Sequence, residues 1–538
     1  MKRNSTLLLL LLACALSPTV FAQTNEPVVA GNDIAVTNTE SGKVKGYIHN
    51  GIFTFKGIPY AKADRFMAPQ KPDSWTDVRS SKTYGPVCPT DPTLTVNDEF
   101  EFAFQHDLGY QNEHCQSLNV WTQKLNDGKK RPVMVWLHGG GFTAGSSIEL
   151  PSYDGEALAK KGDVVLVSVN HRLNILGFLD LSAYGDKYKS SANAGLLDLK
   201  LALQWVHDNI AQFGGDPDNV TIFGQSGGGG KVTCLMNAPS VKGLFKNAIV
   251  ESGSYITNFS EKSVTQKVAA ALLDELHLQA SQVDSLQRIP YDILNEAGKR
   301  AMRKVSADLR KEGKAINGWG PALDGDFLPY QPSDPAAKEF AKNVPLLVGT
   351  TKNEFTPFVP GPKSQTMDEL KASLQKKYGD KTDAFMAAVK STYPTVSTPA
   401  GYTDIEFNFR SMAVKQANEK AVGGAAPVYM YLFTWQSPVN GGIYKAMHCM
   451  DIAFQFNNIA RCQEMTGGGK EAYTLADKIS SAWINFAKTG NPNTPSLPKW
   501  PAYTAENGAT MILDNQCVLK NHPDDELLKI VASAAPKP

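Results

Sequence analysis

The chain has 538 residues and a formal net charge of +1, with 42% hydrophobic and 20% charged residues, which is the composition of a globular protein. This length exceeds one small core, so we expect either one large domain with long insertions or two domains. The near-zero net charge argues against binding to nucleic acid or to anionic membranes through bulk electrostatics.

The first 22 residues, MKRNSTLLLLLLACALSPTVFA, have the three parts of a secretory signal peptide. Lys2 and Arg3 form the positive end, a leucine run follows, and Ala22 closes a stretch suited to cleavage. Ser17 and Pro18 end the apolar run too early for a membrane anchor. We expect cleavage after Ala22 and a secreted or periplasmic protein without stable membrane insertion.

Six cysteines remain in the mature chain, because Cys14 leaves with the signal peptide. The alternative is a lipoprotein in which Cys14 is acylated, but the two residues before it, Leu12 and Ala13, fit a lipidation motif poorly. The six include no CxxC pair, so no zinc site is expected, and an oxidising compartment permits disulfides.

Short apolar segments alternate with segments of helical period in the middle of the chain. We expect strands within 131–141, 162–172, 219–227, 245–254 and 343–354, and a helix within 196–215. This alternation predicts a mostly parallel sheet with helices on both faces. Two polar, lysine-rich segments of helical period, near 255–315 and 362–424, are expected as helical insertions in a single domain, residues 23–538.

The glycine-rich stretch TIFGQSGGGGKVTC, residues 221–234, is compatible at first sight with a phosphate loop or with a nucleophilic serine. A phosphate loop, GxxxxGK[ST], would need glycine where Gln225 stands and Ser or Thr where Val232 stands. The alternative motif, GxSxG, fits residues 224–228 and places Ser226 between an expected strand and an expected helix. That context is typical of the nucleophile turn of an α/β-hydrolase fold.

An acyl-transfer site also needs backbone N–H donors for the oxyanion. The segment HGGGF, residues 138–142, ends an upstream apolar strand with three glycines. We assign Gly140, Gly141 and Gly227 as the donors of the oxyanion hole.

The nucleophile needs a base and an acid, which follow the serine in the chain order Ser, acid, His. His448 and His522 satisfy that order, but His522 lies in a polar tail, so His448 is the expected base. Glu354 follows an apolar strand and is the expected acid. Asp324 and Asp326 precede that strand and are interpreted as turn residues.

In these motifs the chain resembles the type-B carboxylesterases, a family that includes cholinesterases and bacterial para-nitrobenzyl esterases. The resemblance runs from about residue 34 to the C-terminus. It is carried, in order, by FKGIPYA (55–61), EHCQSLNVW (113–121), HGGGF (138–142), FGGDPDNVTIFGQSG (213–227), GPALDGDFLP (320–329), GTTKNE (349–354) and INFAKTGNPN (484–493). It implies the same triad, Ser226, Glu354 and His448, and the same three oxyanion donors. It also implies a Cys88–Cys115 disulfide.

The chain departs from the family pattern at four positions. Gln225 replaces the usual acidic residue before the serine, Gly227 replaces an alanine after it, and Asn353 replaces an aspartate before the acid. His114 replaces the usual aspartate before Cys115. The loop between Cys88 and Cys115 contains no tryptophan, which argues against a cholinesterase role, because cholinesterases use a tryptophan there to bind a quaternary ammonium by cation–π contact.

The proximity of Cys449 and Cys462, with a polar loop-to-helix run between them, leads us to expect a second disulfide there. Cys234 and Cys517 would then be buried thiols.

These observations predict an exported serine hydrolase of carboxylic esters that works through an acyl-enzyme and needs no metal or cofactor. Its substrate would be a small-molecule or polymer-derived ester, with no nucleic-acid partner. The alternatives are an acyltransferase with the same triad and a non-catalytic binding protein of the same fold.

Overall fold

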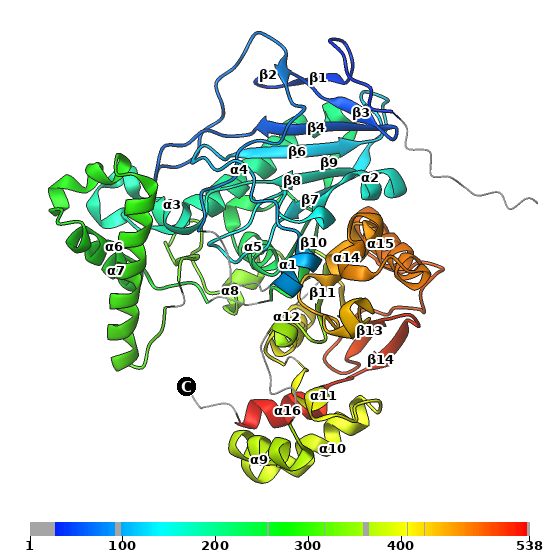
Figure 1. Cartoon of the computed structure of the whole chain (residues 1–538). Helices are drawn as coiled ribbons and strands as arrows, with labels where there is room; N and C mark the ends of the chain where they lie inside the picture. Colours follow the sequence, from blue (N-terminus) through cyan, green and yellow to red (C-terminus); the bar gives the residue numbers. More distant parts are fainter. Residues whose placement is uncertain are drawn as a thin grey trace, which may run out of the picture.

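The computed structural model of the chain describes residues 27–91, 98–254, 258–316, 318–358, 365–405, 407–423 and 426–534. The expected signal peptide lies outside these ranges. The centre of the molecule is an 11-stranded sheet in the order β14-β13-β12-β11-β10-β9-β7-β8-β6-β4-β3 (Figure 1). Its strands are β3 (Tyr47–His49), β4 (Ile52–Pro59), β6 (Ser117–Thr122), β7 (Arg131–Leu137), β8 (Val165–Val169), β9 (Gly215–Gln225), β10 (Asn247–Glu251), β11 (Leu346–Thr351), β12 (Val428–Phe433), β13 (Ala509–Leu513) and β14 (Val518–Asn521).

The middle of this sheet, from β8 across to β13, is parallel, and the pairs at both edges are antiparallel. The five expected strands are β7, β8, β9, β10 and β11, so the parallel sheet predicted from the sequence is confirmed. A separate small sheet pairs β1 (Val36–Thr39), β2 (Gly42–Lys45) and β5 (Arg79–Ser80). Because parallel strands all end at one edge, the loops after β9, β11 and β12 share one edge of the sheet.

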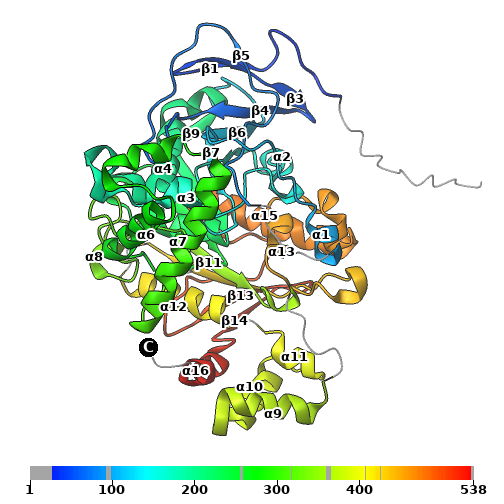
Figure 2. The same cartoon turned by 60° about the vertical axis from the view of Figure 1, so that its left-hand side comes forward.

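Helices cover both faces of the sheet (Figure 2). Alternate residues of β7 show why: Val133 and Val135 pack into one apolar core, and Met134 and Trp136 into another. The first core contains α4 (Ala194–Asn209), α5 (Gly227–Met236) and α12 (Asn408–Gly423). The second contains α1 (Asp98–Phe104), α2 (Glu156–Gly162), α13 (Met450–Gln455), α14 (Gln463–Thr466) and α15 (Lys470–Thr489).

Two groups of helices extend from this body and have apolar cores of their own. Between β10 and β11 lie α6 (Lys262–Glu275) and α7 (Tyr291–Lys311), which project to the left in Figure 1 and pack with α3 (Asn174–Phe178). The short helix α8 (Pro335–Lys338) follows them. Between β11 and β12 lie α9 (Met367–Tyr378), α10 (Thr382–Thr392) and α11 (Pro399–Thr403), which pack with the last helix, α16 (Asp525–Ala534).

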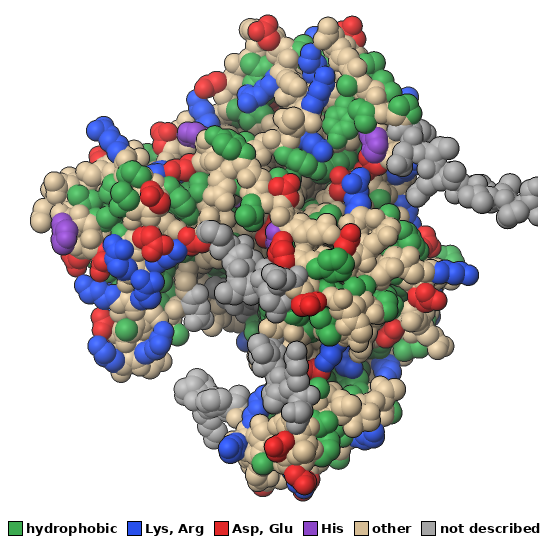
Figure 3. Space-filling model, in the orientation of Figure 1, with side chains coloured by type: hydrophobic (Ala, Val, Ile, Leu, Met, Phe, Trp, Pro, Cys, Tyr) green, Lys and Arg blue, Asp and Glu red, His purple; other side chains and the backbone are tan. Residues whose placement is uncertain are grey.

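Lysine and arginine side chains gather over the α6–α7 lobe (Figure 3), where acidic side chains are interspersed with them. Lys311 pairs with Asp308 on the same helix, and Arg300 of α7 pairs with Glu275 of α6. The basic side chains of the α6–α7 lobe therefore belong to a solvated helical face. Across the described ranges, no helix combines the length and apolar character required to cross a bilayer.

Candidate active site

Ser226 lies in the sharp turn between β9 and α5, at the edge of the sheet where the parallel strands end. Its backbone has φ 57° and ψ −126°, a conformation that is costly for any residue other than glycine. Two hydrogen bonds hold the turn: Ser226 N donates to Glu251 O at 2.8 Å, and Gly230 N donates to Ser226 O at 3.0 Å. The strand and the helix come so close that a Cβ on Gly224 would lie 2.6 Å from the carbonyl carbon of Gly228 in α5. The serine is therefore presented by a strained and tightly packed turn.

Glu354 and His448 come together from the loops that follow β11 and β12. The Glu354 carboxylate pairs with Nδ1 of His448, and His448 N donates to Glu354 O at 2.9 Å. Both side chains are buried, with residue exposures of 0% for Glu354 and 4% for His448. A carboxylate bound to Nδ1 fixes the ring orientation and leaves Nε2 for proton transfer, which is the arrangement a general base needs.

The second carboxylate oxygen of Glu354 has two further donors. Ser252 Oγ donates to it at 2.6 Å and Thr351 N at 2.9 Å. Ser252 was not among the residues predicted from the sequence. It directly follows β10, and its place beside β9 depends on a strand pairing that the local sequence pattern does not show.

The His448 ring faces the residue next to the nucleophile. Nε2 of Gln225 lies 3.2 Å from Nε2 and 3.3 Å from Nδ1 of the ring, and Oε1 of Gln225 accepts from the Cys449 thiol at 3.2 Å. Among the described residues, no hydrogen bond joins the Ser226 hydroxyl to the ring. The structure thus pairs Glu354 with His448 next to the serine turn, with the fully buried amide of Gln225 against the base.

The three predicted oxyanion donors also meet at this turn. Gly140 and Gly141 have φ of +79° and +62°, and Gly227 is the first residue of α5. A Cβ on Gly227 would lie 2.4 Å from both the Cα and the N of Gly141, so the glycine loop packs directly on the start of the helix. None of the three N–H groups donates a hydrogen bond to another residue of the described chain. Three unpaired amides beside a serine form a site that can accept an anion.

Aromatic side chains surround the base. The Phe355 ring centroid lies 4.1 Å from that of His448, and the Phe409 centroid lies 5.5 Å from it. Phe358 stands at 6.0 Å from Phe355 and stacks on Phe100 of α1 at 4.3 Å. Phe355 keeps 43% of its surface exposed, so the base adjoins an open aromatic surface.

All six cysteines of the described chain are free thiols in the structure. Cys88 and Cys115 lie in the same buried cluster, and burial, with a further contribution from Cys88, raises the pKa of the Cys115 thiol. The Cys88–Cys115 disulfide stays a prediction. The Cys449 thiol donates to Gln225, so the structure lends no support to a Cys449–Cys462 bridge. Cys234 and Cys517 are buried, as expected.

Two further carboxyl groups lie buried beneath the site. Burial raises the pKa of Glu251 to about 8 and that of Asp451 to about 7, with the Asp451 and Glu354 charges adding to the respective shifts. Glu251 accepts from Trp483 Nε1 and from Gln455 Nε2, each at 2.7 Å. In the described ranges, no group of three or more His, Cys, Asp or Glu side chains is placed to hold a metal ion.

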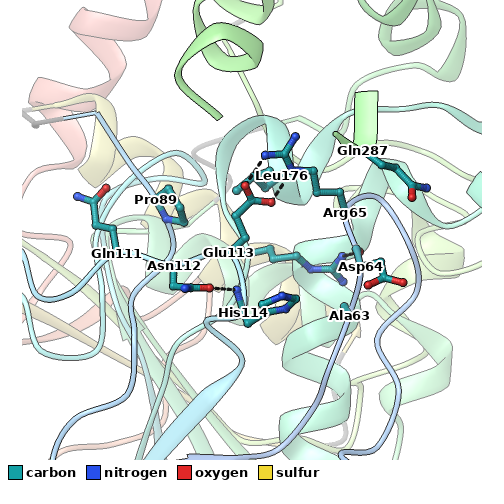
Figure 4. A pocket seen from close by; sticks show the side chains of 11 residues that line it. Ala63, Asp64, Arg65, Pro89, Gln111, Asn112, Glu113, His114, Leu176 and Gln287 are labelled. Carbon is teal, nitrogen blue, oxygen red and sulfur yellow. Dashed lines mark hydrogen bonds and ion pairs between the residues drawn. The ribbon is translucent and has the colours of Figure 1, made fainter. Parts of the chain in front are cut away.

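The histidine and the aspartate that the sequence did not favour as base and acid make contacts elsewhere in the fold. His522 pairs with Asp525 at 2.7 Å, and Asp324 accepts the amide nitrogens of Asp326 and Leu328 in a turn. A polar cavity of about 560 Å³ also lies apart from the triad residues (Figure 4). Its wall contains Arg65 and Glu113, which pair with each other, so its main charges are already satisfied.

Comparison with known proteins agrees with this geometry. A family model described as the carboxylesterase family matches residues 33–530. The chain belongs to the carboxylesterase family. It is 38% identical to the para-nitrobenzyl esterase of Bacillus subtilis (strain 168) over 499 residues, which cover 91% of this chain and 97% of that one. It is 32% identical to carboxylesterase 1E of Mus musculus over 515 residues, covering 89% and 90% of the two chains.

Solved structures of carboxylesterases have the same fold. An esterase from anaerobic Clostridium hathewayi, whose title states that it can hydrolyze aliphatic aromatic polyesters, superposes with a TM-score of 0.84. It is 38% identical, and the match covers 94% of this chain and 99% of that one. A PNB esterase superposes with a TM-score of 0.75 at 35% identity over 92% and 99% of the two chains. The protein is therefore a carboxylic ester hydrolase with the α/β-hydrolase fold.

Proposed function

We propose that this carboxylesterase is an exported serine enzyme that works through an acyl-enzyme, with Ser226, His448 and Glu354 as its triad. One observation carries the proposal: the Glu354 carboxylate binds Nδ1 of His448 beside a strained serine turn. Three unpaired backbone amides lie at that same turn. A nucleophile, a base and an anion site at one edge of the sheet are the groups that acyl transfer requires, which supports this proposal.

In the first half of the reaction, Ser226 Oγ attacks the ester carbonyl and its proton passes to Nε2 of His448. The carbonyl oxygen becomes an oxyanion, which the N–H groups of Gly140, Gly141 and Gly227 stabilise. His448 then donates the proton to the leaving alcohol as the tetrahedral intermediate collapses to the acyl-enzyme.

In the second half, His448 takes a proton from water, and the hydroxide attacks the acyl carbonyl. Collapse of this second intermediate releases the acid and returns the proton to Ser226. Glu354 stabilises the imidazolium that forms in both halves without itself becoming protonated.

The aromatic surface around His448 supports esters that carry an aryl group, from small molecules or from polymers. Phe355 and Phe409 flank the base within stacking distance, and Phe358 extends the surface to α1. Aromatic faces bind aryl groups with about 1 kcal/mol beyond area burial. A chain related to this one is described as hydrolysing aliphatic aromatic polyesters, which agrees with that chemistry.

The test is the Ser226→Ala variant assayed on a panel of p-nitrophenyl, aryl and polyester-derived substrates. We expect turnover to fall about 10³-fold or more while the melting temperature stays close to wild type. A covalent organophosphate adduct should map to Ser226 alone. Turnover retained by Ser226→Ala would overturn the mechanism.

The base is tested by a matched pair of histidine variants. The kcat/KM profile should rise with pH through one ionisation, because only neutral imidazole accepts the serine proton. His448→Ala should remove this rise, and His522→Ala should retain it. An assay with added alcohol distinguishes an ester hydrolase from an acyltransferase, because only the acyltransferase would form a new ester with that alcohol.

Export is tested by N-terminal sequencing of the mature protein, which should begin at Gln23 if the signal peptide is cleaved after Ala22.

A further inference from the structure

We propose that Lys231, a buried lysine of α5, is a positioning residue that orients the N–H of Gly140, one of the three oxyanion donors, through the carbonyl groups of the glycine loop. The inference rests on the proposed function and assigns a role to a residue that stands outside the triad and the oxyanion hole.

Lys231 has no exposed surface, although it is a charged residue type. Burial lowers its pKa to about 7, and the Glu149 carboxyl favours its charged form. A buried ammonium is costly unless specific hydrogen bonds compensate for the lost water. The contacts of this side chain therefore identify what it stabilises.

Those contacts are with the backbone of the predicted oxyanion loop. Lys231 Nζ donates to His138 O at 2.9 Å and lies 3.4 Å from Gly139 O. Gly139 O also accepts from Nδ1 of His138 at 2.9 Å when that nitrogen carries the proton. Both carbonyl groups are thereby turned toward the interior of the protein, where α5 lies.

The planarity of the peptide bond converts this contact into an orientation of the donors. The described chain has no cis peptide bond, so the C=O of Gly139 and the N–H of Gly140 point in opposite directions within one rigid plane. If Gly139 O points toward Lys231, Gly140 N–H must point away from it. The same holds for His138 O and Gly139 N–H.

Besides Glu149, the titratable groups near Lys231 include His138, His171 and Cys234, and burial favours the neutral form of each of these three. His138 and His171 stack with ring centroids 5.2 Å apart, and burial lowers the pKa of both. The Cys234 thiol, on the same helix, has its pKa raised by burial. Lys231 is therefore the side chain of α5 that donates to both carbonyl groups.

The test compares Lys231→Met with Lys420→Met. Lys420 is a matched control because it is also mostly buried and donates to two backbone carbonyls, Ala341 O at 2.7 Å and Lys342 O at 2.8 Å, in another part of the fold. We expect Lys231→Met to lower kcat about tenfold to hundredfold with little change in KM, since misplaced donors weaken the transition state and not the ground state. Lys420→Met should retain the wild-type kcat even if it lowers the melting temperature.

A second measurement uses an aryl trifluoromethyl ketone. Ser226 Oγ adds to its carbonyl carbon, and the carbonyl electron pair becomes an oxyanion held by the same amides. Its Ki should rise in Lys231→Met by about the factor by which kcat/KM falls, with rates normalised to active sites. Lys231→Gln, which keeps an N–H donor, should be intermediate and serves if the Met variant does not fold.

The outcomes separate this inference from the proposed function. If Ser226→Ala retains turnover, the proposed function fails. If Ser226→Ala is inactive and both Lys231 variants keep the wild-type kcat and Ki, the positioning role alone is wrong. A loss confined to the melting temperature would likewise overturn it.

Discussion

Gln225 is the side chain that touches the base in place of an acidic residue. Its Nε2 atom lies 3.2 Å from Nε2 of His448. In Gln225→Glu a carboxylate would stand there and favour the imidazolium, which cannot accept the serine proton. We expect the ascending limb of kcat/KM against pH to move about one unit higher. Gln225→Met carries no charge and should leave the limb in place. An unmoved limb in Gln225→Glu would show that the contact is absent in solution.

Gly227 is the other departure from the family pattern within the site. A Cβ at this position would lie 2.3 Å from Gly141 O and 2.4 Å from Gly141 N, so Gly141 would have to move. Gly227→Ala should therefore lower kcat about tenfold or more by displacing an oxyanion donor. Gly469→Ala is the matched control, because Gly469 also lies at the start of a helix, as the residue before α15, and its Cβ would meet only a side-chain oxygen, at 3.3 Å. Equal kcat values for both variants would contradict the prediction.

At the scale of elements, the loops after β11 and β12 are joined into one unit. Glu354 and Met447 form a parallel bridge, and Asn353 Oδ1 accepts from Ala446 N at 3.1 Å. Asn353 Nδ2 donates to Asp404 O at 2.7 Å, which fastens both loops to the segment before α12. The acid and the base are therefore held together by their loops as well as by their own contact.

Loss of the Asn353 hydrogen bonds that join the two loops should lower kcat more than it changes KM. Asn353→Ala should lower kcat about tenfold with a smaller change in KM, because the acid and base lose their fixed separation. Steady-state kinetics on one p-nitrophenyl ester measures the split. Asn507→Ala is the control, since Asn507 closes an exposed turn before β13 by accepting from Thr504 N at 2.9 Å. A drop in kcat of the same size in both variants would point to general loosening.

The sequence predicted five strands of the parallel centre, β7 to β11, because they are continuous apolar runs, and it did not predict β13, which is also parallel and buried. The edge strands escaped prediction: β3 and β14 are short, and neither has a buried residue. Chain order and strand ends led to Ser226, Glu354 and His448. Contacts made across the fold could not be read this way, as Ser252 with Glu354 and Lys231 with His138 show. Such pairs are set by sheet order and helix packing, which local patterns do not encode.

For the whole molecule, the buried carboxyl groups couple stability to pH. Glu251 is fully buried, and its pKa is raised from 4.5 to about 8, chiefly by burial. Between these values the folded chain holds a proton that the unfolded chain has released. The stability this group contributes is therefore fully present below about pH 4.5 and is lost as the pH rises through about 8. The slope for one such group is about 1.4 kcal/mol per pH unit at most.

Glu251→Gln isolates this contribution because glutamine does not titrate. Gln455 Oε1 has no hydrogen-bond partner among the described residues, so a flip of that amide would let it accept from the new side chain. We expect the variant to lose less stability than wild type between pH 5 and pH 9, measured by chemical denaturation across that range. Glu526→Gln, an exposed substitution in the first turn of α16, should follow the wild-type curve. Parallel curves for wild type and Glu251→Gln would mean that Glu251 is ionised in the folded protein at neutral pH.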